Sequence, residues 1–269
     1  MQANGSTLRA AGATVIALGL LAVACGSTQS AQNASKEQAQ SSAPAKPTTA
    51  MQAVAAKGYN PHIDPKNFVK KIDNPFFPLK PGTKNELRSK TADGLGHETL
   101  TVTHDTKEIA GVTTTVIKDV STLNGKLEEK TTDWYAQDKQ GNVWYFGEDT
   151  ATYKKNGQVE STEGTWKTGV DGAKPGVIMN ANPQVTDSYR QEYYKGEAVD
   201  MYWVIAKNQT IKVPYGTFHN AVLTMEWTPL EPKVASEKYY VPGIGIVAER
   251  NLSGGLENIE LLNVTHNGS

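Results

Sequence analysis

Apolar and polar side chains alternate with a period of two along most of the chain from about residue 83 to residue 268. Leu100 and Val102, for example, stand between threonines. Valine and threonine at this density favour strands, because branched side chains fit a pleated, half-buried surface. Asn124-Gly125 indicates a hairpin turn, since both residue types tolerate a positive φ. The pattern predicts a mainly β fold: a curved antiparallel sheet, half-barrel or barrel-like, chained by hairpins.

Three segments depart from this alternation. Asp64-Pro65 is typical of a helix start, because the carboxylate caps free amides and proline is tolerated at the first helical position. A short N-terminal helix is therefore predicted over 65–71. Residues 74–83 combine three prolines with two phenylalanines, which predicts a rigid strap packed over one end of the core. Residues 169–187, rich in glycine, asparagine and proline around an apolar centre, predict a long loop with an apolar tip.

The amino-terminal residues have the pattern of an export signal. Residues 1–9 carry one basic side chain, Arg9, and no acid, and residues 10–24 form an uncharged apolar segment. This segment is shorter than the roughly 20 residues that a permanent transmembrane helix needs. Residues 1–24 are therefore predicted to be a signal peptide that is removed after export.

Cys25 follows this segment directly and is preceded by the small side chains of Ala22, Val23 and Ala24. This arrangement is typical of a bacterial lipoprotein processing site. Cys25 is the only cysteine of the sequence, so a disulfide within the chain does not explain it. We predict that Cys25 carries fatty acyl chains, such as palmitate, which attach the exported protein to the outer face of a membrane in a bacterial cell envelope.

Composition divides the remainder into a tether and a folded part. Residues 25–57 are small and polar with almost no branched aliphatic side chain, so they are predicted to be a lipidated flexible tether. Residues 58–269 are predicted to form a single antiparallel β domain. The whole chain has a formal net charge of −1, and nothing in this balance favours nucleic acid as a partner.

The sequence shows no familiar catalytic or metal-binding pattern. The sequence contains no HExxH, no GxSxG and no glycine-rich phosphate loop with its lysine. The histidines are scattered, without the short spacing that would place two of them on one metal. No catalytic residue, metal or cofactor is therefore predicted.

Aromatic side chains are the enrichment that suggests a binding role. They are interpreted either as ordinary cross-strand core or, in part, as the lining of a cavity for an acyl chain or a sugar face. Charged side chains at the mouth of such a cavity would be its polar partners. The candidate ligand-binding residues are Trp134, Trp144, Tyr189, Tyr193, Trp203, Trp227, Arg190 and Glu226.

Four motifs resemble an uncharacterised family of bacterial exported lipoproteins. They are residues 74–83, the aromatic hairpin 133–148, residues 213–218 (VPYGTF) and residues 239–245 (YYVPGIG). This resemblance covers most of residues 60–265 and implies no assigned activity. The last two motifs are also similar to LolA-type envelope carriers of lipoproteins, in which a curved antiparallel sheet wraps an apolar cavity.

These observations give one leading interpretation and two alternatives. The leading one is a non-enzymatic surface lipoprotein that binds an apolar or amphipathic ligand, such as a lipid, or an envelope partner. The second is an envelope hydrolase that uses paired carboxylates such as Glu192 and Glu226. The third is a structural or adhesion module whose aromatic face binds a polysaccharide or a protein.

Overall fold

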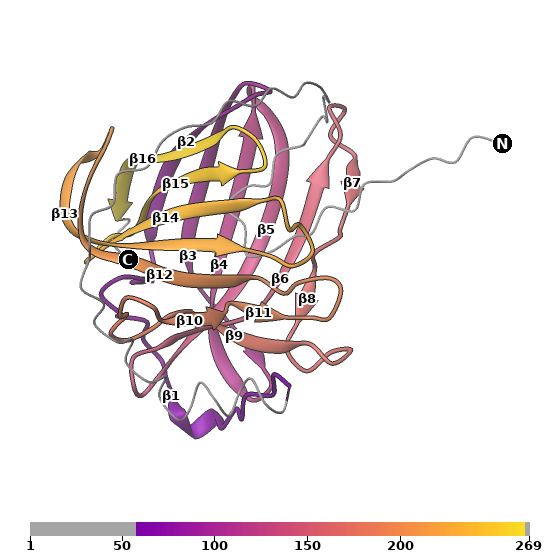
Figure 1. Cartoon of the computed structure of the whole chain (residues 1–269). Coiled ribbons are helices and arrows are strands. Elements are labelled where there is room, and N and C mark those ends of the chain that lie inside the picture. Colours follow the sequence, from indigo (N-terminus) through magenta and orange to yellow (C-terminus); the bar gives the residue numbers. More distant parts are fainter. Residues whose placement is uncertain (1–57, 267–269) are drawn as a thin grey trace, which may run out of the picture. The chain divides into compact units, whose positions relative to one another are not determined.

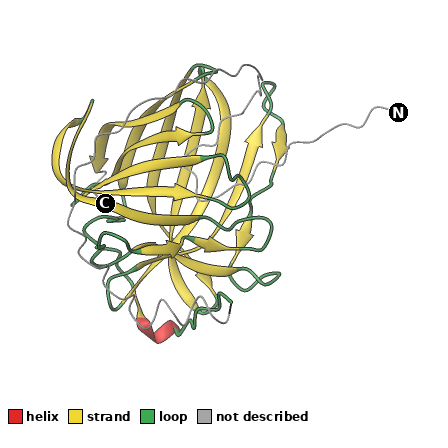
Figure 2. Ribbon diagram, in the orientation of Figure 1, coloured by secondary structure: helices red, strands yellow, loops and turns green. Residues whose placement is uncertain are grey.

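The structure, a computed structural model, describes residues 58–266, and these form an almost entirely β body (Figures 1 and 2). The predicted antiparallel, barrel-like fold class is confirmed. The strands are β1 (Phe68–Val69), β2 (Thr83–Thr91), β3 (Leu95–Ile109), β4 (Val112–Leu123), β5 (Lys126–Asp138), β6 (Val143–Tyr153), β7 (Val159–Ser161), β8 (Trp166–Lys167), β9 (Lys174–Met179), β10 (Ser188–Arg190), β11 (Glu192–Tyr193), β12 (Met201–Val213), β13 (Gly216–Trp227), β14 (Ala235–Val241), β15 (Gly245–Ser253) and β16 (Glu257–His266).

Hairpin connections order the sheet almost by sequence. Strands β12 to β16 follow one another, β16 pairs with β2, and β2 to β6 continue the order. In Figure 1 the β12–β15 strands cross in front of the β2–β5 strands. The predicted turn at Asn124-Gly125 joins β4 to β5, with φ angles of 50° and 75° that match a tight hairpin.

A short segment nearly closes the sheet into a barrel. Strand β10 pairs with β12 at one end of the order, and β11 pairs with β9 at the other end. Only Gln191 separates β10 from β11 along the chain. The backbone of Gln191 passes so close to Gly176 that a β-carbon there would collide with it. The chain thus crosses between the two ends of the sheet at this point.

The enclosed face of the barrel holds the main core cluster. Tyr135 and Tyr145 from one half of the sheet share this cluster with Tyr202 and Tyr240 from the other half. Phe77 bridges the halves, with its ring centroid 5.3 Å from that of Tyr135 and 6.4 Å from that of Tyr240. Side chains that meet from opposite halves identify this face as the inner one.

The predicted strap at residues 74–83 is confirmed as a segment packed on the core. Phe76, Phe77 and Leu79 contact the inner cluster. Gln137 holds the start of the strap, because its side-chain oxygen accepts hydrogen bonds from the backbone amides of Asp73 (2.9 Å) and Asn74 (2.8 Å).

Two local predictions were wrong. The helix expected over 65–71 is a single 3₁₀ turn, Pro65–Asn67, and the chain then continues as β1, which pairs with β5. Asp64 does cap this turn by accepting a hydrogen bond from the amide of Lys66. Residues 169–187 are not one long loop, because residues 174–179 form β9. Ile178 and Met179 are buried in that strand, so the apolar centre was a core strand.

Candidate functional site

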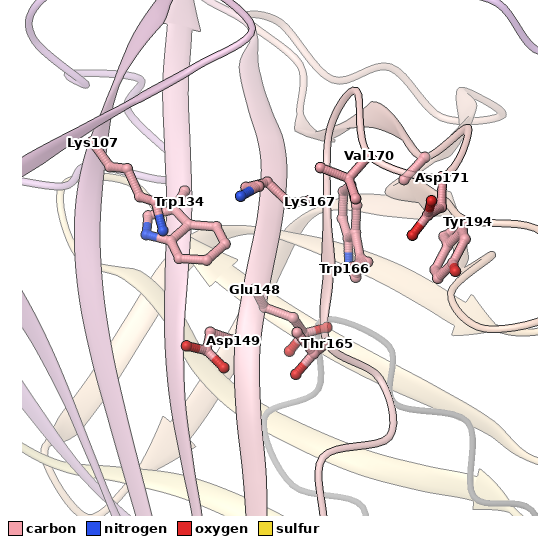
Figure 3. A pocket seen from close by; sticks show the side chains of 11 residues that line it. Lys107, Trp134, Glu148, Asp149, Thr165, Trp166, Lys167, Val170, Asp171 and Tyr194 are labelled. Carbon is pink, nitrogen blue, oxygen red and sulfur yellow. The ribbon is translucent and has the colours of Figure 1, made fainter.

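A pocket of about 370 Å³ lies beside β6, where β8 and the loop that precedes β9 approach it (Figure 3). Its lining combines aromatic, acidic and basic side chains. The lining residues are Lys107, Trp134, Glu148, Asp149, Thr165, Trp166, Lys167, Val170, Asp171, Ala173 and Tyr194. The mixture suits a ligand with both apolar and polar parts.

Gly147 on β6 allows β8 to form one wall of this pocket. Its φ is 138°, and a β-carbon at this position would lie 2.5 Å from the carbonyl oxygen of Trp166 and 2.8 Å from the Cα of Lys167. Glycine therefore permits the close approach of the two backbones. The approach fixes Trp166 directly across from Glu148, its Cα partner on β6.

Aromatic contacts connect the pocket to the core. The Lys107 ammonium lies 3.8 Å from the ring centroid of Trp134, a favourable cation–π distance. Trp166 meets Tyr145 edge-on at 5.3 Å, and Tyr145 stacks on Tyr135 at 4.6 Å. The pocket wall that contains Trp166 is therefore continuous with the aromatic cluster inside the barrel.

Carboxyl side chains share the inner face with this cluster, a feature that the sequence interpretation missed. Cα register places Glu98 across from Leu87 and Ser121, and Asp133 across from Ile117 and Glu148. Cross-strand partners point to the same side of a sheet. Further buried carboxyls around the barrel interact electrostatically with Glu98 and Asp133 or with their neighbours. We call this set the inner acidic face; among residues 58–266 it comprises Glu98, Asp119, Asp133, Glu148, Glu192, Asp200, Glu226, Glu249 and Glu257.

Burial favours the protonated form of most carboxyls on this face, because a low dielectric disfavours the charged form. It raises the pKa of Glu98, Glu148 and Glu192 well above the ordinary value. Neighbouring negative charges add to the effect, chiefly Asp119 on Glu98 and Glu192 on Glu148. Burial also raises the pKa of five others, to about 6 for Asp200, about 7 for Asp133 and for Glu249, about 8 for Asp119 and about 9 for Glu257.

Lys238 on β14 is a buried cation on this face. Its Nζ lies 2.6 Å from Oε2 of Glu226 and 3.8 Å from Oε2 of Glu249. Burial alone would lower the pKa of Lys238, but the two carboxylates outweigh burial and raise it. Oε1 of Glu226 also accepts hydrogen bonds from the hydroxyls of Tyr240 (3.0 Å) and Thr224 (3.1 Å). Glu226 is thus fully engaged by its own fold.

Buried polar atoms elsewhere on the inner face lack such partners. The hydroxyls of Ser89 and Ser121 and the side-chain amide nitrogen of Gln191 have no hydrogen bond, although these residues are at most 3% exposed. Glu98 and Asp119 are hydrogen-bonded to each other, and this contact helps to raise the pKa of Glu98. An unpaired buried polar atom costs about 1–3 kcal/mol.

The predicted ligand-binding residues do not form one site in the structure; of the eight, only Trp134 is among the residues that line the pocket. The Trp144 indole donates a hydrogen bond to Asp138 at 2.9 Å. Tyr189 stacks on Tyr202 of the inner face at 5.4 Å. The remaining five do not line the pocket. Glu226 is bound to Lys238, the Arg190 guanidinium lies 5.3 Å from the Tyr193 ring, and Trp203 and Trp227 are 42% and 39% exposed.

The apolar stripe of β12 and β13 lies on the outer face. Trp203 pairs with Met225, and Met201 with Trp227, so these four side chains share that face. The inner face of the same strands carries Tyr202 and Glu226 instead. A signal for the inner acids was present in the sequence, because Glu98 continues the alternating stripe of Leu100 and Val102. An acid in phase with apolar positions is a better indicator of this face than aromatic content.

Two further structural findings concern metals and membrane spans. Within residues 58–266, no three His, Cys, Asp or Glu side chains are grouped closely enough to hold a metal ion. In the same residues no helix has the length and apolar character that crossing a membrane would require.

Comparison with known proteins gives two structural likenesses. One is to a protein described as exported, with a YmcC-like fold, from Bacteroides fragilis (17% identity, TM-score 0.39). The other is to a protein described as a lipoprotein from Parabacteroides distasonis (12% identity, TM-score 0.39). Each covers 71% of this chain and 98% of the other chain. No protein-family model and no curated protein matches the chain.

Proposed function

We propose that this protein is a non-enzymatic surface lipoprotein, anchored through lipid on Cys25, whose β domain binds an amphipathic ligand or an envelope partner. The anchor is supported by the export pattern of residues 1–24 and by Cys25 itself. These residues lie outside the part of the chain that the structure describes.

The observation that carries the binding proposal is the composition of the inner face. A barrel selected only for stability would fill this face with apolar side chains, because each buried carboxyl costs several kcal/mol unless it is paired. Here Glu98 and Glu192 are fully buried beside other carboxyls, and the hydroxyl of the nearly buried Ser121 has no hydrogen-bond partner among the described residues. Costs of this kind are typical of functional sites, where local stability is given up for recognition.

An amphipathic ligand fits this arrangement better than a purely apolar one. The aromatic cluster around Tyr135 and Tyr145 provides apolar contact. The carboxyls on the same face provide hydrogen bonds to polar groups. The pocket beside Trp166 lies next to both and is the proposed entrance.

Occupation of the pocket can be tested by blocking its mouth. Val170 lines the pocket and is 45% exposed, so Val170→Trp adds bulk without disturbing buried packing. Val185→Trp is the matched control, since Val185 is 47% exposed and does not line the pocket. We expect native mass spectrometry of the full chain, purified in mild detergent, to show a co-purified ligand in the wild type and in the control but not in Val170→Trp. Equal ligand content in all three would contradict the proposed entrance, and no ligand in any of them would contradict the binding proposal.

The anchor is tested separately with Cys25→Ser. We expect this variant to lose incorporation of labelled palmitate and to leave the membrane fraction. Ser27→Ala, two residues away, is the control and retains both properties. Membrane association unchanged in Cys25→Ser would refute the anchor.

A further inference from the structure

We propose that the inner acidic face binds a ligand that carries alkylammonium groups, as in a polyamine or a lysine side chain. This inference rests on the proposed binding function and specifies its chemistry. The site is formed on the neighbouring strands β16, β2, β3 and β4, by the carboxyls of Glu98, Asp119 and Glu257 and the hydroxyls of Ser89 and Ser121.

Lys238 shows how this face holds an ammonium group. Its amine is buried between Glu226 and Glu249, at 2.6 and 3.8 Å from their nearest oxygens. Among the ion pairs of the described residues, those of Lys238 are the ones that involve the inner acidic face. Glu98, Asp119 and Glu257 take part in none of these ion pairs.

Several polar atoms of the proposed site are buried without a hydrogen bond, most clearly the two serine hydroxyls. Ser121 is the Cα partner of Glu98, and Ser89 is the partner of Gly96, whose missing side chain leaves room for the Ser89 hydroxyl. Both serines are more than nine-tenths buried, and their hydroxyls have no hydrogen bond. One oxygen of Glu257 and one of Asp119 are also unpaired. An ammonium group has three donors, which one or two of these carboxyls together with a serine hydroxyl can receive.

Apolar neighbours favour an alkyl chain attached to the ammonium group. Leu87 is the Cα partner of Glu98, and Ile259 is two residues from Glu257 on the same strand face. Both side chains are fully buried. A bare divalent cation fits less well, because no three acids within residues 58–266 are close enough to coordinate one and calcium needs six to eight oxygen ligands.

Proton release provides a signature for such binding. The acids that act on Glu98 are Asp119, Glu249 and Glu257, and burial raises the pKa of all four. Glu128 and Lys238 also act on Glu257. An ammonium ligand favours the ionised carboxyls, so it must displace their protons as it binds. Its affinity is therefore expected to rise with pH between about 6 and 9, while an alkylamine stays charged.

The experiment is isothermal titration calorimetry of the full chain in mild detergent with three probes: spermidine, tetralysine and fully acetylated, uncharged spermidine. Titrations at pH 6 and pH 8.5, in phosphate and in HEPES, report affinity and proton release. We expect saturable binding of spermidine or tetralysine that is at least 10-fold tighter at pH 8.5, with protons released, and no binding of the acetylated probe. Preference for spermidine indicates a free polyamine, and preference for tetralysine indicates a peptide; both support the shared chemistry.

Matched variants locate the site. Glu257→Gln is expected to weaken binding at pH 8.5 at least 10-fold, and Glu98→Gln serves as a second variant if the first does not fold. Glu260→Gln is the control, because Glu260 lies on the same strand but pairs with Arg88 at the surface. An unchanged affinity in both inner variants overturns the proposal. Equal binding of the acetylated probe, or no binding of either cation, also overturns it. The wider proposed function fails only if no ligand co-purifies with the chain.

Discussion

Replacement of Glu257 by glutamine should stabilise the protein at alkaline pH. Glu257 is 7% exposed, and burial, followed by the charges of Glu249 and Glu128, raises its pKa from 4.5 to about 9. As pH rises, the unfolded chain therefore loses this proton before the folded chain does. The stability that the protonated carboxyl contributes is complete below about pH 4.5 and is lost progressively up to about pH 9.

The size of the effect follows from this difference in pKa. At pH 8 the solution is about 3.5 pH units above the ordinary pKa of Glu257, and each unit corresponds to about 1.4 kcal/mol. The free energy of unfolding of the wild type is therefore lower at pH 8 than at low pH by at most about 5 kcal/mol from this group. Glutamine has nearly the same shape and no proton to retain. We expect Glu257→Gln to be more stable than the wild type by about 2–5 kcal/mol at pH 8 and equal to it within about 0.5 kcal/mol at pH 4.5.

Urea unfolding followed by tryptophan fluorescence at the two pH values measures this difference. The control is Glu260→Gln, which removes the exposed ion pair with Arg88 (2.8 Å) and should cost about 0.2–1 kcal/mol at both pH values. A Glu257→Gln variant that is less stable than the wild type at pH 8, or that differs from it equally at both pH values, would refute the reasoning.

Three further variants test other contacts. Lys238→Met leaves Glu226 as a buried charge without its cation and should cost about 3–5 kcal/mol at pH 7, most of which the double variant with Glu226→Gln should recover; urea unfolding of both checks this. Gly147→Ala places a β-carbon against the β8 backbone at a φ of 138° and should lower stability by about 1–3 kcal/mol, measured by thermal unfolding. Gln137→Ala leaves the strap amides of Asp73 and Asn74 unpaired and should cost about 2–4 kcal/mol and increase proteolysis near residue 75, measured by limited digestion.

The alternation of the sequence was sufficient to predict the fold class, because period and turn chemistry are local properties. Asn124-Gly125 adopts the backbone angles that its residue types allow. The helix predicted after Asp64 did not form because strand pairing competes with it. The cap forms, but Phe68 and Val69 pair with the last two residues of β5. Glycine and proline around residues 174–179 suggested a loop, yet Gly176 is the position where Gln191 crosses closely.

Which face of a strand lies inside could not be predicted from hydrophobicity in this protein. On β12 and β13 the more apolar stripe, with Trp203, faces outward, while Glu226 faces inward. An acid is ordinarily expected on the solvent side, and its true position depends on partners, such as Lys238, that are distant in the sequence. The candidate aromatics were selected by residue type, whereas the pocket and the inner acidic face are assembled by register across many strands.

Both ends of the sheet order are covered by residues 188–193, since β10 bonds to β12 and β11 bonds to β9. Free strand edges recruit other chains and are a common origin of aggregation. Because residues 188–193 pair with β12 and β9, the hydrogen-bonding edges of those two strands are not open to a neighbouring molecule there. Damage to this segment is therefore expected to produce fibrous assemblies before it produces loss of the monomer fold.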